Sequence, residues 1–229
     1  VSIVLPDGYS ASSDAASGNL FGTAPGQDAS FRDGNIDALA GNNVEAQTLT
    51  INGRSTQSVV VGQNEMASSI AAKVNGVAES TGVEATARTT ATLSRPNPGG
   101  PIAFSLNGIP ILATVNSGDF RNLAEAINDK VSKTGVYASF DPEQGILTLT
   151  NPDGRDISMS DFSAAIRPNT IDLTGSSGVP VRLRDTGVVP DTDLDSTVVG
   201  GYVEFKSNRS FSVLSSINAD SGGIFAGLA

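Results

Sequence analysis

The feature that most constrains the fold is an internal repeat, because the stretch 49–93 is echoed between 104 and 150. Each copy opens with alternating apolar and polar residues that lead into Asn-Gly, at Asn52-Gly53 and at Asn107-Gly108. Alternation that ends in Asn-Gly predicts a β-hairpin with a type I′ turn, since both central residues of that turn need a positive φ. Each copy is therefore expected to begin with a hairpin.

The periodicity then changes in both copies from that of a strand to that of a helix. Helices are predicted over 64–78 and 120–133, with Asn64 and Asp119 as N-cap residues. Each helix ends near Thr-Gly, where glycine can adopt the left-handed cap conformation. Two interpretations of Gly76 stay open: it weakens the first helix by roughly 1 kcal/mol relative to alanine, or it ends that helix early.

A shift of 53 residues aligns the two copies from the helix onward. It places Ile70 on Leu123, Ala71 on Ala124, Val74 on Ile127, Asn75 on Asn128, and Thr81-Gly82-Val83 on Thr134-Gly135-Val136. A strand resumes directly after each helix, and in the second copy the strands 137–140 and 146–150 read as a hairpin. Each unit thus reads β-hairpin, helix, β-hairpin. This order predicts an α+β fold of two small β-rich subdomains.

The stretch 95–101 is the clearest predicted boundary, because it holds three prolines and two glycines and is expected to continue neither strand nor helix. The predicted domains are 1–95, with the first repeat at 45–94 and completed by 196–229, and 101–195, with the second repeat at 102–159. Short strands are expected at 171–173 and 179–183, and a last strand pair at 198–206 and 211–215. The end, 222–227, echoes 18–22, which favours chain ends that lie close together.

Composition excludes several classes of function. The chain has 14 Lys and Arg against 24 Asp and Glu, a net charge of −10, and no basic cluster, so neither nucleic acid nor an anionic membrane is expected as a partner. No apolar run is long enough to span a bilayer. Without histidine or cysteine, the chain cannot build a Ser-His-Asp or Cys-His site, an ordinary zinc site or a disulfide.

Two acidic groups are the remaining candidates for a site. The run Asp191-Thr192-Asp193-Leu194-Asp195-Ser196 has alternate carboxylates like a calcium loop, but Ser196 and Tyr202 stand where an EF-hand needs glycine and glutamate. It is interpreted as a solvated acidic turn, and the set Asp153, Asp156 and Asp161 has a weaker claim. No acid lies in an apolar sequence setting that would raise its pKa. No catalytic, cofactor-binding or metal-binding residue is therefore predicted, and an enzyme is not expected.

The repeats resemble the flagellin IN motif of bacterial flagellar proteins. The first copy resembles it through Leu49-Thr50-Ile51-Asn52-Gly53, Ile70-Ala71-Ala72-Lys73-Val74-Asn75 and Thr81-Gly82-Val83-Glu84-Ala85-Thr86-Ala87. The second does so through Asn107-Gly108, Leu123-Ala124-Glu125-Ala126-Ile127-Asn128, Thr134-Gly135-Val136-Tyr137-Ala138 and Ile146-Leu147-Thr148-Leu149-Thr150. The closing Gly201-Tyr202-Val203-Glu204-Phe205 and Phe211-Ser212-Val213 are similar to the stretch that returns from the variable region of flagellin to its helical trunk.

This resemblance implies the central, surface-exposed outer region (D2/D3-type domains) of a flagellin, the structural subunit of the flagellar filament, which is exported through the flagellar secretion channel. It implies that other flagellin subunits are partners, mainly through trunk helices that this sequence does not contain, so that the sequence is expected to be an excised fragment. Exposed Ser and Thr are possible acceptors of O-glycans. No cofactor is implied.

Three alternatives stay open. The same motif occurs in the filament cap protein and in hook-associated junction proteins, although two tandem copies with this closing segment favour the filament subunit. An adhesive, glycan-binding module is the third. Against it, sugar sites usually need an aromatic platform, and Tyr9, Tyr137 and Tyr202 are scattered along the chain.

Overall fold

A computed structural model describes residues 41–42, 44–116, 118–175, 178, 180–187 and 194–217. In these ranges the chain is mostly β-sheet, with thirteen strands and four short helices, so the prediction of a β-rich α+β fold is confirmed at this level. The predicted contact between 18–22 and 222–227 lies outside the described residues, as does most of the acidic run that begins at Asp191.

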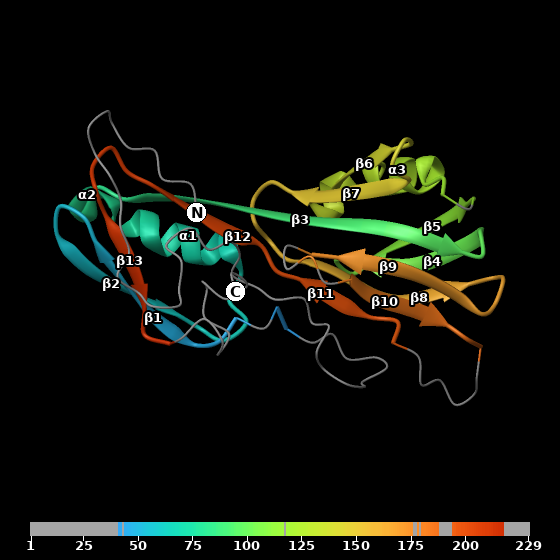
Figure 1. Cartoon of the computed structure of the whole chain (residues 1–229), viewed down its shortest axis with the longest axis horizontal. Coiled ribbons are helices and arrows are strands. Elements are labelled where there is room, and N and C mark those ends of the chain that lie inside the picture. The colour runs from blue at the N-terminus through green and yellow to red at the C-terminus, as the bar shows by residue number, and fades with distance from the viewer. Residues whose placement is uncertain are drawn as a thin grey trace.

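One part of the molecule, called here the first lobe, is built around a helix between two β layers (Figure 1). Its elements are β1 (Gln47–Asn52), β2 (Thr56–Val61), α1 (Ala67–Gly76), α2 (Ala78–Thr81), β12 (Tyr202–Lys206) and β13 (Ser212–Ser215). A three-stranded antiparallel sheet has the order β13-β1-β2. The apolar residues of β1 alternate with polar ones, so Leu49 and Ile51 point into the core, where Ile70 and Val74 of α1 are also fully buried.

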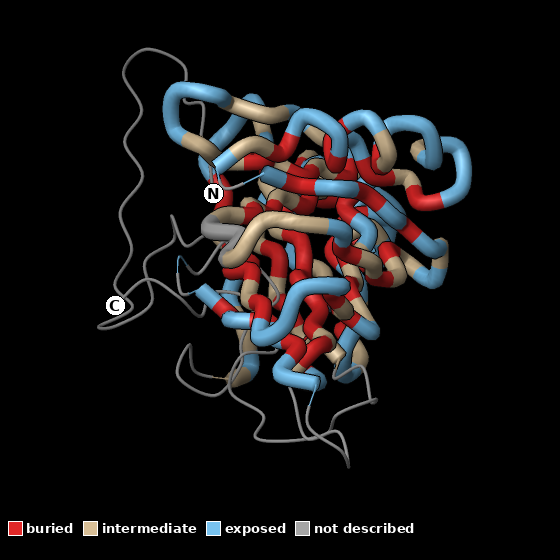
Figure 2. The backbone as a smooth tube through the Cα atoms, turned by 90° about the vertical axis from the view of Figure 1, so that its right-hand side faces the viewer, coloured by how far each residue is buried: buried red, intermediate tan, exposed pale blue. Residues whose placement is uncertain are grey.

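The second lobe holds two sheets that share one hydrophobic core. The first has the order β10-β9-β3-β7-β6 and the second β11-β8-β4-β5. These elements are β3 (Glu84–Asn97), β4 (Gly100–Leu106), β5 (Ile109–Val115), β6 (Tyr137–Asp141), β7 (Ile146–Asn151), β8 (Ile157–Ala164), β9 (Asn169–Thr174), β10 (Pro180–Asp185) and β11 (Thr197–Val199). The helices are α3 (Arg121–Asn128) and α4 (Val131–Thr134). Because α3 contacts both β5 and β6, it lies across the last strands of the two sheets. Along the strands buried and exposed residues alternate (Figure 2).

A single long strand, β3, joins the two lobes (Figure 1). It pairs with β12 through 84–88, with β7 through 89–93 and with β9 from Thr92 to Asn97. Ala85 belongs to the first core, whereas Ala91 and Leu93 belong to the second. The first repeat therefore does not close with the predicted hairpin, because this one strand continues into the second lobe. The predicted domain bounds remain a prediction.

The interpretation of 95–101 as a segment that continues no strand is wrong. β3 runs to Asn97 and β4 begins at Gly100. The ladder between β3 and β9 shifts register between Ser94 and Asn97, and such a bulge leaves residues out of the hydrogen-bond ladder. Pro96, which has no N–H to donate, can therefore stand within the strand.

The two Asn-Gly turns differ. Asn107 and Gly108 have φ values of 48° and 76°, which confirms the predicted type I′ turn of the second copy. In the first copy Asn52 pairs with Thr56, and Gly53–Ser55 form a three-residue loop in which no residue has a positive φ. The backbone N–H of Arg54 donates to the carbonyl of Thr81 at 2.7 Å, and a Cβ on Gly53 would collide with that carbonyl. Contact with α2 thus replaces the predicted type I′ turn.

The helices are shorter than predicted. The first begins at Ala67, since Asn64 has a φ of 55° and lies in the preceding turn instead of at the N-cap. It ends at Gly76, so the second of the two open interpretations holds. The second helix splits into α3 and α4. Phe120 is the N-cap residue there, although the Asp119 carboxylate still accepts the Arg121 N–H at 3.0 Å.

The strands predicted at 171–173 and 179–183, and the hairpin from 137 to 150, are confirmed as β9, β10 and the β6–β7 pair. The predicted pairing of 198–206 with 211–215 is wrong. These residues form three strands, and β12 pairs with β3 while β13 pairs with β1. Alternating apolar and polar residues correctly predict strands here. Which strands they pair with depends on the burial of Val203, Phe205 and Val213 in the first core.

Candidate functional site

The two acidic groups singled out from the sequence do not form a described metal site. Asp153, Asp156 and Asp161 are not gathered into a metal-ligand cluster, and no set of three or more acidic side chains suited to a metal occurs among the described residues. Of the run that begins at Asp191, the described part shows Asp195 buried and accepting the Ser196 hydroxyl at 2.7 Å.

Asp156 corrects the expectation that no acid has an environment that raises its pKa. Burial raises the pKa of Asp156 from 3.8 to about 6, and the hydrogen bond from Asn42 opposes part of that rise. The Asn42 amide donates to both carboxylate oxygens, at 3.2 and 3.0 Å, and also to the carbonyl of Glu65 at 3.2 Å. Because Asp156 directly precedes β8 and Asn42 lies beside the first lobe, this carboxyl links the two lobes. The local sequence gives no sign of it, since the burial comes from tertiary packing.

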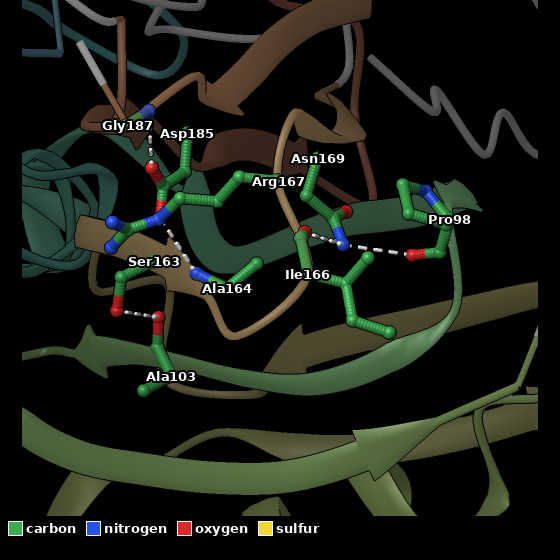
Figure 3. Close-up of polar contacts among 9 residues, drawn as sticks. All are labelled: Pro98, Ala103, Ser163, Ala164, Ile166, Arg167, Asn169, Asp185 and Gly187. Carbon is green, nitrogen blue, oxygen red and sulfur yellow. Dashed lines mark hydrogen bonds and ion pairs between the residues drawn. The ribbon is translucent and has the colours of Figure 1, made fainter.

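A second carboxylate, Asp185, is held at the end of β10 (Figure 3). It accepts the Ala164 N–H and the Arg167 Nε–H at 2.8 Å each, and the Gly187 N–H at 3.0 Å. The residue is only 7% exposed, whereas the Arg167 side chain is half exposed. With its oxygens engaged by three donors, Asp185 ties β10 to the loop after β8. This is a structural role.

Two further sets of polar contacts involve β9. Asn169 donates to the carbonyls of Pro98 and Ile166, at 2.8 and 3.3 Å, and so fixes the start of β9 against the β3–β4 turn (Figure 3). Across the β9–β10 pair, Arg182 makes a two-point contact with Asp172 at 2.7 and 3.0 Å. Hydrogen bonding to Asp172, together with its charge, raises the pKa of Arg182.

The most informative polar contacts are a pair of asparagine clamps, one in each lobe. In the first, the Asn75 side chain donates to the Ala85 carbonyl at 2.8 Å and accepts the Ala85 N–H at 2.7 Å. In the second, Asn128 does the same to Ala138, at 2.9 Å for both bonds. Each clamp fastens the end of a helix to the strand that follows it.

The same correspondence extends to the turn between helix and strand. Thr81 donates its hydroxyl to the carbonyl of Val77 and accepts the Val83 N–H. Thr134 repeats both contacts with Lys130 and Val136. Gly82 and Gly135 follow with φ values of 71° and 70°, the left-handed conformation that glycine adopts without steric cost. These contacts join residues that the shift of 53, seen from Asn75 to Asn128, also aligns in the sequence.

The described surface offers no aromatic platform. Its exposed large apolar residues are Val60, Met66, Leu112, Tyr137, Ile166 and Leu214. They lie on different elements, with Tyr137 on β6 as the one aromatic among them, and Tyr202 lies on β12, which does not pair with β6. Tyr9 lies outside the described residues. None of the helices in the described part of the chain has the length and apolarity needed to cross a bilayer.

Comparison with known proteins gives little beyond these observations. No protein-family model and no curated protein sequence matches the chain. Among solved structures, the chain is similar to the D2–D3 domains of the flagellar cap protein FliD from Escherichia coli, with 14% sequence identity and a TM-score of 0.22. That match covers 81% of this chain and 100% of the other. A TM-score of this size does not establish a common fold.

Proposed function

We propose that this chain is the outer, surface-exposed region of a bacterial flagellar filament subunit, and that its role is structural. The observation that carries the proposal is the duplicated asparagine clamp. Asn75 and Asn128 stand at aligned positions of the two stretches that resemble the flagellin IN motif, and each makes the same two bonds to the strand that follows. The resemblance in sequence is therefore matched by a resemblance in contacts.

Both units can be read as copies of one repeat. The first consists of the β1–β2 hairpin, α1, α2 and the start of β3, and the second of the β4–β5 hairpin, α3, α4 and β6. They differ at the end, because β7 returns beside β6 whereas β3 continues into the other lobe. In this proposal the second hairpin of the first copy has been replaced by the strand that joins the lobes.

The chemistry of the described residues fits a structural role. The buried Asp185 and Asp172 are each held by an arginine, and the half-buried Asp156 by an amide, so we assign these carboxyls to packing and not to a reaction. A net charge of −10 would make neighbouring copies repel each other and keep a dense array soluble. We propose no cofactor and no enzymatic activity. Other flagellin subunits are the proposed partners, and exposed Ser and Thr could carry O-glycans.

An in-frame deletion of residues 44–217 in the gene of the producing cell tests this proposal. The account predicts that filaments still assemble but are thinner in electron micrographs, because the outer region contributes to the diameter and not to the polymerising contacts. Filaments of unchanged diameter would exclude this chain from the filament coat. Release of unassembled flagellin into the medium, with short filaments, would instead assign the chain to the cap.

A further inference from the structure

The clamp by Asn128 acts on a strand edge. In the described part of its sheet, β6 is the last strand, with β7 on one side only. Ala138 stands opposite Leu149 in the antiparallel pair. In such a ladder both backbone groups of a residue point to the same side, and Ala138 gives both to Asn128. Its N–H and C=O therefore point away from β7, toward the place where a further strand would add.

The preceding backbone N–H on this edge, that of Val136, is also bound by a side chain. The N–H of Val136, two residues earlier and so on the same side of the strand, donates to the Thr134 hydroxyl at 3.1 Å. Thr134 supplies an acceptor to the Val136 N–H, and Asn128 supplies an acceptor to the Ala138 N–H and a donor to the Ala138 carbonyl. An added strand would offer the same groups. These two side chains therefore reproduce the contacts of a missing neighbour strand.

The residues of β6 itself provide little protection against strand addition. Edges are commonly guarded by lysine or proline, but β6 reads Tyr-Ala-Ser-Phe-Asp and contains neither. It exposes Tyr137, which is 54% accessible. The edge strand of the other sheet, β5, differs because Pro110 has no N–H and because Asn122 of α3 donates to the Thr114 carbonyl at 3.1 Å. Thus α3 covers the edges of both sheets with amide side chains.

We propose that Asn128 and Thr134 together mimic a neighbouring strand at Val136 and Ala138, and that by occupying this part of the free edge they prevent a second copy of this chain from adding its own β6 there. This inference goes beyond the proposed function and does not depend on it. A simpler role, in which Asn128 only anchors α3, would affect stability alone. The proposed role also affects association, and the two can be measured separately.

The first test uses the unaltered chain and amide hydrogen exchange followed by NMR. The Ala138 amide points away from β7, so it is protected only through Asn128. We expect it to exchange at least about tenfold more slowly than an unprotected amide. Exchange at the unprotected rate would show that the clamp does not hold the edge, and would overturn the proposal whether or not any variant folds.

The second test uses Asn128→Ala in the full chain, combined with Ser139→Cys. The chain has no cysteine of its own, and Ser139 is the exposed central residue of β6. In an antiparallel pair of β6 strands centred there, the two copies of residue 139 would face each other at about 4.5 Å between Cα atoms, within the range of a disulfide. We expect several-fold more disulfide-linked dimer than with Ser139→Cys alone, and a sedimentation coefficient that rises with concentration.

The matched control is Asn75→Ala, also combined with Ser139→Cys. It removes the same two bonds from Ala85, but a Cβ on Gly154 would collide with Ala87, the next position along that side of β3. Because the turn at Gly154 already occupies this side, we expect the control to stay monomeric. A folded Asn128→Ala variant that remains monomeric and cross-links no more than the control would overturn the proposal.

Discussion

At the scale of single residues, two carboxyls with hydrogen-bond partners far away in the sequence affect how the chain responds to pH and to substitution. Asp156 could not be identified from the sequence, because its neighbours Arg155 and Ile157 suggest an ordinary surface acid followed by a strand. Burial in the folded chain raises its pKa, and its hydrogen-bond partner Asn42 is 114 positions away. Asp185 likewise collects its donors from three separate residues, as backbone N–H groups of Ala164 and Gly187 and the side chain of Arg167. Contacts of this range are set by tertiary packing, and no local pattern predicts them.

Asp156 makes stability depend on pH. Its pKa is about 6 in the folded chain against 3.8 as the ordinary value, so between these values the folded chain binds more protons than the unfolded one. The stabilising contribution is complete below about pH 4 and is lost as the pH rises through about 6. We expect Asp156→Asn to abolish this pH dependence, which amounts to about 3 kcal/mol between the two pKa values. Urea unfolding across this range, compared between the variant and the unaltered chain, measures it, and parallel curves would contradict the assignment.

Asp185 should matter more than its arginine partner. In Asp185→Ala the buried Ala164 N–H loses its acceptor, and we expect a loss of about 2 kcal/mol in the free energy of unfolding. In Arg167→Ala the carboxylate keeps its two backbone donors, and the arginine is half exposed, so less than about 1 kcal/mol should be lost. Denaturant titration of both variants checks the order. Equal losses would mean that the ion pair and not the backbone contacts holds this corner.

At the scale of elements, local pattern predicts what forms, and packing decides where it ends. The second Asn-Gly turn and the β6–β7 hairpin follow the sequence because each is closed by its own residues. The first Asn-Gly forms a different loop, since the Thr81 carbonyl lies against it. The asparagine clamps, too, could be predicted from the sequence only in part. The alignment of Asn75 with Asn128 is visible in the sequence, but the edge groups that they bind are visible only in the structure.

The two clamps should differ in their effect on stability. Both asparagines make two bonds to a strand, but those of Asn75 are partly buried whereas those of Asn128 are exposed. Lost hydrogen bonds cost more where water cannot replace them, so we expect about 2 kcal/mol for Asn75→Ala and about 1 kcal/mol or less for Asn128→Ala. Thermal and denaturant unfolding of the two variants gives the comparison. The reverse order would contradict this account of the clamps.

The end of α1 offers a stabilising substitution. Gly76 is the last residue of that helix, its φ is not positive, and a Cβ placed on it would meet no atom within 4 Å. Alanine restricts the unfolded chain more than glycine and favours the helix, so Gly76→Ala should add about 0.5–1 kcal/mol. A raised denaturation midpoint with an unchanged slope is the expected result. A lowered midpoint would mean that the break at Val77 requires glycine before it.

At the scale of the whole molecule, β3 organises the chain. Its first half lies in the core of the first lobe and its second half in the core of the second, so the lobes share a continuous strand (Figure 1). The sequence suggested a break at 95–101 because proline and glycine are frequent there, yet a bulge keeps the strand running to Asn97. The strands that complete the first lobe, β12 and β13, come from more than 100 residues further along the chain. Pairings over this separation cannot be read from alternation alone.

The central claim is that this chain covers the outside of a flagellar filament. Immunogold electron microscopy of the producing cell, with antibody raised against the chain, tests it most directly. The account predicts gold particles along the whole length of each filament. Label at the filament tip or at the hook junction only would instead assign the chain to the cap or to a junction protein. Cells whose flagella carry no label at all would contradict the flagellar account and leave the adhesive module as the explanation.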